Sequence, residues 1–208
     1  MSLSLVHSRA LLGLEARPVC VEVHLANGLP SFTLVGLAET EVKEARERVR
    51  SAIQNTGLEF PANKRITVNL APADLPKDSG RFDLPIALGI LAASGQIDAR
   101  KLEGYEFAGE LSLGGDLRPV RGALAMSLAL AQPGSLAPAG LPKLVLPEGS
   151  AQEAALVPDA EIYRAHHLLD VVRQFLPGDT PPEVLDGDRK STRLNSSHIQ
   201  KSRMPSSA

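Results

Sequence analysis

The chain has 208 residues, a formal charge of −2, and 43% hydrophobic but only 3% aromatic residues. This length is enough to bury one sizeable core, which must be largely aliphatic because tryptophan is absent. A single cysteine excludes an internal disulfide framework, and no apolar run approaches the length of a membrane span. We therefore expect a cytoplasmic protein without a membrane partner.

Three strand-like runs open the chain, over residues 2–7, 19–25 and 32–37. The second run alternates cleanly, with valines and a leucine on one face and Cys20, Glu22 and His24 on the other. Asn27-Gly28 favours a tight turn into the third run. Together the three runs predict an antiparallel meander.

The clearest helix is predicted over residues 39–56, where apolar residues fall on one stripe and Gly57 suits the stop. Acidic side chains alternate on it with basic ones, so a solvated amphipathic face is the favoured interpretation. The alternative is a surface for DNA or for a neighbouring subunit. The basic side chains concerned are Lys43, Arg46, Arg48 and Arg50.

The remaining pattern alternates strands with helices. A strand over 65–70 precedes an apolar helix over 82–94, with Pro85 in its first turn. A strand over 106–113 is expected to turn at Gly114-Gly115-Asp116 and to return over 117–120. Further expected elements are a helix over 122–131, a loop over 132–142, a strand over 143–146, a short helix near 151–156, a strand over 160–163 and a helix over 167–175.

The end of the chain differs in composition from the rest. Residues 177–187 are Pro-rich, acidic and aperiodic, which predicts a linker. Residues 188–208 are Ser-rich and basic, resemble a translated sequencing adapter, and are expected to be a disordered artefact. A basic arm for nucleic acid is the less favoured alternative. Without this tail the chain holds 17 basic and 23 acidic side chains, a charge of −6 that does not favour phosphate binding.

The loop before the second helix is the best candidate for a binding surface. Two prolines stiffen it, and it ends at a helix start, where backbone amides favour an anion. Its candidate binding residues, for a DNA strand or a partner peptide, are Lys77, Asp78, Ser79 and Arg81. A structural role, in which Asp83 caps the helix or pairs with Arg81, is an equal alternative.

Other clusters of polar residues favour structural roles. Cys20, Glu22 and His24 share one strand face, but no second cluster supplies further ligands, so no metal site is predicted. The neighbouring His166 and His167 are expected at a solvated helix terminus.

Several longer motifs lie along the chain, namely Val21-Glu-Val-His24, Gly28-Leu-Pro30, Val35-Gly-Leu37, Val42–Ile53, Ile66–Lys77, Asp83-Leu-Pro-Ile-Ala87 and Gly109–Leu113. Together they are similar to the amino-terminal domain of ComM-type (YifB) Mg-chelatase-like AAA+ ATPases. This resemblance implies a two-layer α+β domain over residues 1–176, of the type shared by the second domain of ribosomal protein S5 and by Lon proteases. It also implies a hexameric motor that promotes DNA branch migration in natural transformation and recombination.

The motor itself needs a phosphate-binding loop of the form G-x-x-x-x-G-K-[ST], and this pattern does not occur in the sequence. We therefore expect this chain to be truncated before its ATPase domain. We also expect the chain itself to bind no cofactor. ATP, Mg²⁺, DNA and the hexameric assembly are expected only through the missing motor.

Two other functions remain as alternatives. In a Lon-type peptidase a lysine activates a serine nucleophile, and the resemblance places Asp83 and Met126 at those two positions. Neither side chain can do that chemistry, so catalysis is expected to be lost. Ser79 beside Lys64 or Lys77 would be a rearranged active site. The third function is a free-standing interaction module.

Overall fold

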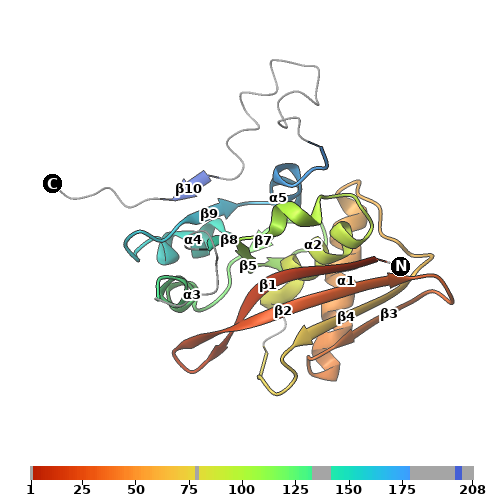
Figure 1. The fold of residues 1–208 in the computed structure, drawn as a ribbon, viewed down its shortest axis with the longest axis horizontal. Helices are drawn as coiled ribbons and strands as arrows, with labels where there is room; N and C mark the ends of the chain where they lie inside the picture. Colours follow the sequence, from red (N-terminus) through yellow and green to blue (C-terminus); the bar gives the residue numbers. More distant parts are fainter. Residues whose placement is uncertain (1, 78–79, 133–141, 179–199, 203–208) are drawn as a thin grey trace, which may run out of the picture.

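The computed structural model describes residues 2–77, 80–132, 142–178 and 200–202. One eight-stranded sheet, in the order β10-β9-β8-β5-β1-β2-β4-β3, runs through the molecule beside a small sheet of β6 and β7 (Figure 1). In the large sheet, β1–β2, β2–β4 and β9–β10 pair antiparallel, and the other neighbours pair parallel. The predicted α+β fold is confirmed.

The first half of the chain forms the more antiparallel end of this sheet. Alternate residues of its strands are buried, so one face packs against helices and the other is open. Its elements are β1 (Ser2–Leu12), β2 (Glu15–Ala26), β3 (Ser31–Val35), α1 (Glu39–Asn55) and β4 (Arg65–Ala71).

The predicted meander is wrong in its third strand. β3 does not lie beside β2, because β4 occupies that place and pairs antiparallel with β2. β3 instead runs parallel to β4 at the sheet edge. A parallel pair needs a crossover connection, and α1 between the two strands provides it.

Helix α2 (Asp83–Ala93) lies at the centre of the fold, and each of its residues is buried. It follows the short 3-10 turn η1 (Gly80–Phe82) and precedes η2 (Ala99–Leu102). Gly89 lets the helix approach the sheet closely, since a Cβ there would lie 2.5 Å from Cγ2 of Val23. The Ser4 hydroxyl donates to the Gly89 carbonyl at 2.6 Å, which fixes the helix on β1.

The second half of the chain adds parallel strands covered on both faces. Val145 on β8 belongs to the main core with α2 and α5, whereas Leu144 and Leu146 pack with α3 and α4 in a second core. Burial on both faces is typical of parallel strands. The elements are β5 (Tyr105–Phe107), β6 (Glu110–Leu111), β7 (Leu117–Arg118), α3 (Ala123–Leu130), β8 (Lys143–Pro147), α4 (Glu148–Ala154), β9 (Ile162–Ala165) and α5 (Leu168–Gln174).

The strand predicted over 106–113 is interrupted in the structure. β5 ends at Phe107 in the large sheet, and β6 starts at Glu110 in the small one. Between them Gly109 donates its amide to the Arg81 carbonyl and accepts from the Leu84 amide. The chain therefore bends toward the start of α2 instead of continuing as one strand.

The C-terminal residues contribute one short strand. β10 (Gln200–Ser202) pairs antiparallel with β9, and the predicted disordered tail did not include such a strand. The rest of the predicted tail and the linker beyond Gly178 lie outside the described residues. No helix within the described ranges is both long and apolar enough to cross a membrane.

Candidate functional site

A largely buried pair of opposite charges lies where α2 begins. Asp83 is completely buried, and its carboxylate accepts hydrogen bonds from Nε and Nη2 of Arg48 at 2.6 and 3.3 Å. The backbone amide of Leu111 donates to the same carboxylate at 3.1 Å. This one side chain therefore joins α1, α2 and β6.

The protonation of Asp83 depends on two opposing effects. Burial raises the pKa of its carboxyl to about 7, and the hydrogen bonds and charge of Arg48 oppose that rise. Glu110 nearby raises the pKa further. Arg48 also lies 3.6 Å from Glu44, one turn away on α1. A carboxylate without exposed surface that is held by an arginine is suited to fixing helices in place.

Asp83 has a different partner from the two predicted for it. Asp83 does not cap α2. The N-cap residue of this helix is Phe82, and no side-chain hydrogen bond caps it. Asp83 also pairs with Arg48 rather than with Arg81. Arg48 lies 35 positions earlier in the chain, so local sequence gave no signal for this pair.

Arg81 points into the fold rather than toward solvent. It is 4% exposed, and its Nη2 donates to the Arg121 carbonyl at 2.6 Å. Its Nη1 donates weakly to the Arg9 carbonyl at 3.5 Å and lies 3.8 Å from the sulfur of Met126. The guanidinium thus links η1 to β1 and to the start of α3.

The two Lon-like positions have separate surroundings. Asp83 lies among the main-core residues of α2, whereas Met126 is fully buried in the second core and is contacted by Arg81. The thioether of Met126 cannot act as a base, and the Asp83 carboxylate held by Arg48 is a poor nucleophile toward amides.

Lys77 in the predicted binding loop is also turned inward. Its ammonium donates to the carbonyls of Pro72 and Leu75, and its side chain is buried. Burial lowers the pKa of Lys77, and the nearby charge of Asp74 opposes this shift. Asp78 and Ser79, the other two predicted residues, lie outside the described residues.

The basic residues of α1 are mostly engaged within the molecule. Arg46 donates to the Phe32 carbonyl at 2.8 Å, and Arg50 stacks over the Phe60 ring at 5.2 Å. Arg48 holds Asp83, so three of the four basic side chains have intramolecular partners. These contacts favour a structural helix over a DNA-binding one.

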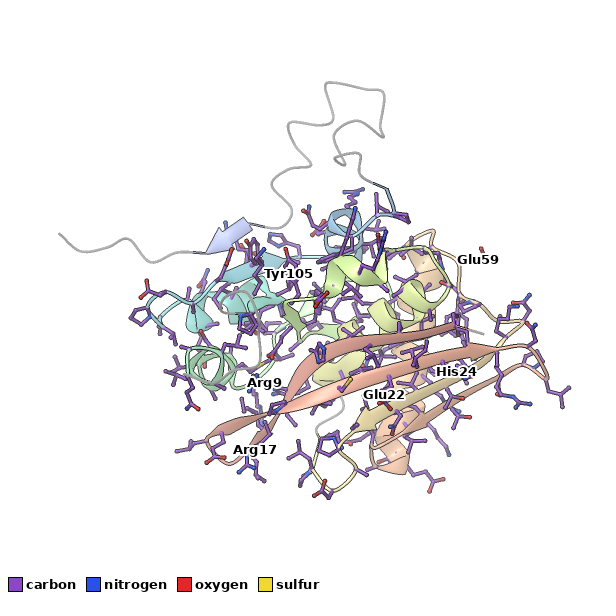
Figure 2. All side chains as sticks on the ribbon, viewed as in Figure 1. Arg9, Arg17, Glu22, His24, Glu59 and Tyr105 are labelled. Carbon is purple, nitrogen blue, oxygen red and sulfur yellow. The ribbon has the colours of Figure 1, made fainter. Side chains whose placement is uncertain are left out.

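The open face of the first four strands carries Cys20, Glu22 and His24, as the alternation predicts. Figure 2 labels Glu22 and His24 on β2. Glu22 accepts a hydrogen bond from Asn69 on β4 at 2.7 Å. Burial raises the pKa of the Cys20 thiol, and Glu22 adds to the rise. Within the described residues, no three His, Cys, Asp or Glu side chains converge as a metal site requires.

The histidine pair near residue 166 has defined partners. His167 Nδ1 accepts a hydrogen bond from the Leu169 amide, and the Asp170 carboxylate accepts one from the His167 amide. These two bonds form a capping box for α5. Its Nε2 lies 2.9 Å from the Gly114 carbonyl. His166 lies 3.1 Å from Glu148. The spacing His-x-x-Asp was the available signal for this cap.

A second buried ion pair was not predicted from the sequence. Arg9 on β1, labelled in Figure 2, donates to Glu106 on β5 from Nε at 2.8 Å and from Nη2 at 3.1 Å. Arg9 also donates to the Ala16 carbonyl, and both charged side chains are almost fully buried. This pair connects the two halves of the large sheet.

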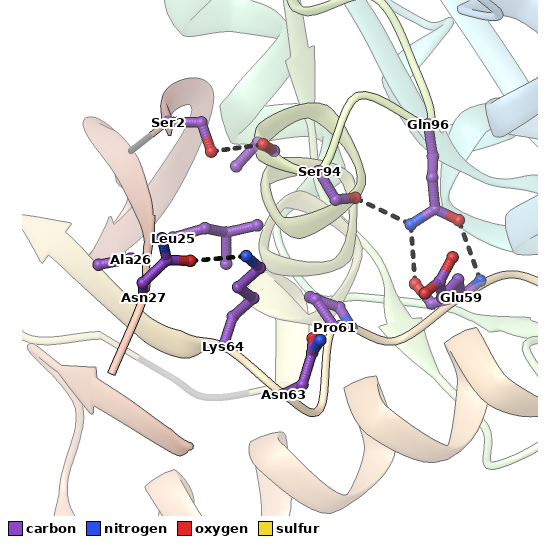
Figure 3. Close-up of a pocket in the computed structure, with 11 residues that line it drawn as sticks. Ser2, Leu25, Ala26, Asn27, Glu59, Pro61, Asn63, Lys64, Ser94 and Gln96 are labelled. Carbon is purple, nitrogen blue, oxygen red and sulfur yellow. Dashed lines mark hydrogen bonds between the residues drawn. The ribbon is translucent and has the colours of Figure 1, made fainter. Parts of the chain in front are cut away.

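An open groove of about 340 Å³ lies at the other end of α2 (Figure 3). Its polar groups bind one another: Lys64 donates to Asn27, and Gln96 pairs with the backbone of Glu59. Ser2 donates to the carbonyl of Ala93. Because these polar groups are hydrogen-bonded to one another, the groove resembles a solvated boundary between neighbouring chain segments.

Comparison with known proteins identifies related sequences over most of the chain. Residues 21–148 match the family model for subunit ChlI of Mg-chelatase. Over 178 residues, 86% of this chain, the sequence is 56% identical to competence protein ComM of Haemophilus influenzae and 51% identical to the uncharacterized protein YifB of Escherichia coli. An uncharacterized protein of Mycobacterium tuberculosis is 36% identical over 180 residues. The chain spans about a third of the length of these relatives.

Proposed function

Because this chain belongs to the family of the ChlI subunit of Mg-chelatase, we propose that it acts as a non-catalytic accessory domain of a ComM-type DNA branch-migration ATPase. The observation that carries this proposal is the 56% identity with competence protein ComM, which extends over 178 residues. The proposed role is in natural transformation and DNA recombination, in the cytoplasm.

The geometry at the start of α2 supports the non-catalytic part of this proposal. Asp83 is enclosed and paired with Arg48, and Met126 is buried beside Arg81. Lys77 donates to two backbone carbonyls, so its amine is already engaged. These side chains hold the domain together, and a peptidase would need a free amine beside a nucleophile.

The cofactors and partners belong to the proposal as well. We expect ATP and Mg²⁺ to bind a separate motor domain, which also carries the contacts for hexamer formation and DNA. This domain would support assembly or guide DNA. No metal, nucleotide or lipid is expected to bind the chain itself.

A chimaera tests the function directly. In H. influenzae, the matched 178-residue region of ComM is replaced by the corresponding region of this chain, and transformation frequency is measured. We expect the chimaera to restore the frequency of the unaltered strain, whereas this chain expressed alone in a comM deletion does not. A stable chimaera that transforms no better than the deletion would contradict the proposal.

The same chimaera with Arg48→Ala is the matched test of the structural role of Asp83. We expect lower levels of intact protein and a proportional loss of transformation.

The purified chain should give no turnover of fluorogenic peptides. Turnover that Ser79→Ala abolishes would instead establish the peptidase alternative.

A further inference from the structure

The two edges of the large sheet differ in how their backbone groups are used. On β3, the Ser31 amide donates to the Lys64 carbonyl of the segment before β4, so the backbone groups of Phe32 point away from β4. Arg46 from α1 donates to that outward carbonyl of Phe32 at 2.8 Å. A side chain therefore interrupts this edge, as proteins commonly do to prevent strand pairing.

The β9 edge has the same kind of outward groups. The Leu144 amide donates to the Glu161 carbonyl at 2.9 Å, which directs residues 161 and 163 toward β8. By alternation, the amides and carbonyls of Ile162 and Arg164 point outward. β10 lies along this edge, with Gln200 opposite Arg164 and Ser202 opposite Ile162.

We propose that the outer edge of β9 is a strand-addition site that takes an extended peptide segment in antiparallel orientation. In this chain, Gln200–Ser202 occupies it. The register makes Gln200 and Ser202 the residues that exchange hydrogen bonds with β9, whereas the Lys201 amide points away. Main-chain bonds of this kind provide affinity in strand addition, and side-chain pockets provide specificity.

Recognition at this edge depends mainly on the backbone. The added segment Gln-Lys-Ser has no apolar side chain, so it brings no hydrophobic anchor. The site therefore selects an extended segment and tolerates changes in its sequence.

Amide hydrogen exchange of the full chain tests the site. Gln200→Pro with Ser202→Pro removes both donor amides of β10. We expect the amides of Ile162 and Arg164 to exchange on the order of tenfold faster in this double variant. Tyr163 donates to β8 and serves as the internal control, and Lys201→Pro, whose lost amide points away from β9, is the matched control variant. Equal exchange of Ile162 and Arg164 in all three proteins would overturn the proposal.

A peptide added in trans separates backbone from side-chain recognition. Peptides with the sequence of residues 196–206 are mixed with the double variant, and the same amides are followed. The native peptide and a permuted one should both restore protection, and a peptide N-methylated at the positions of Gln200 and Ser202 should not. Protection by the methylated peptide, or failure of the permuted one, would refute recognition through the backbone.

Discussion

At the scale of single residues, the fold depends on charges that have been removed from water. Asp83 has no exposed surface, so it must hold either a proton or a counter-charge. Its pKa is raised to about 7, well above the value near 4 of an unfolded carboxyl. The protonated Asp83 carboxyl therefore contributes its full share of the free energy of unfolding below about pH 4. That contribution is lost as the pH rises through about 7. At higher pH the charged form depends on Arg48.

We therefore predict that Arg48→Ala costs more stability in alkaline than in acidic solution. At pH 8 an unpaired buried carboxylate should lower the free energy of unfolding by about 3–5 kcal/mol. At pH 5 the loss should be smaller, because Asp83 is protonated and needs no counter-charge. Urea unfolding at the two pH values measures the difference, and Glu44→Ala, which removes only the exposed partner of Arg48, is the control. A loss independent of pH would show that Asp83 keeps one protonation state.

The residues of this site were only partly predictable. The sequence marks the segment from Pro72 to Asp83 as unusual, because it combines charges and prolines before an apolar helix. It does not show that Lys77 and Arg81 turn inward. Lys77 bonds to carbonyls of its own loop, whereas Arg81 finds the Arg121 carbonyl, which only the folded chain brings near. Long-range partners of this kind have no local pattern.

At the scale of elements, α2 illustrates how closely a helix and a sheet can approach. Alanine at position 89 would favour the helix by up to about 1 kcal/mol. Its methyl group, however, would lie 2.5 Å from Cγ2 of Val23 and 3.6 Å from the Ser4 hydroxyl. Because interiors are close-packed, the steric cost should exceed the gain in helix propensity.

We predict that Gly89→Ala lowers the free energy of unfolding by about 1–3 kcal/mol. Val23→Ala alone should also destabilise, because it leaves a cavity. Together the two substitutions should cost clearly less than the sum of the single effects, since the new methyl group enters that cavity. Urea titration of all four proteins gives the coupling, and strict additivity would show that helix and sheet separate instead.

Elements were easier to predict than their order in the sheet. Helix α1 and strand β4 begin and end within one residue of the predicted positions. Their apolar spacing is a property of the local sequence, so it could be recognised without the fold. The position of β3 beyond β4 was not predicted, because Asn27-Gly28 suggested a return to β2. Strand neighbours depend on the path of α1 across the sheet, which local patterns do not contain.

At the scale of the whole molecule, one ion pair connects the two halves of the sheet. β1 and β5 share a single paired position, His7 opposite Glu106. The Arg9–Glu106 pair lies at this narrow junction and is almost fully buried. Burying two charges is costly, so its contribution lies in orienting the halves as much as in stability.

We predict that Glu106→Leu alone costs about 3–5 kcal/mol, because Arg9 is left charged and unpaired. Adding Arg9→Met should recover most of that loss, less about 1–3 kcal/mol for the Ala16 carbonyl that loses its donor. Thermal and urea unfolding of the single and double variants give the comparison. A double variant no more stable than Glu106→Leu would show that the pair contributes more than charge compensation.

The unequal edges of the large sheet set a limit on assembly. An open-ended fibre needs two adhesive surfaces on every subunit, so that each added molecule offers a new place for the next. Here Arg46 occupies the outward Phe32 carbonyl at the β3 end, and the strand on β9 is Gln200–Ser202 of the same chain. A chain whose own segment lies along β9 fills the place that a neighbouring copy would need there, which limits growth of a polymer through that edge.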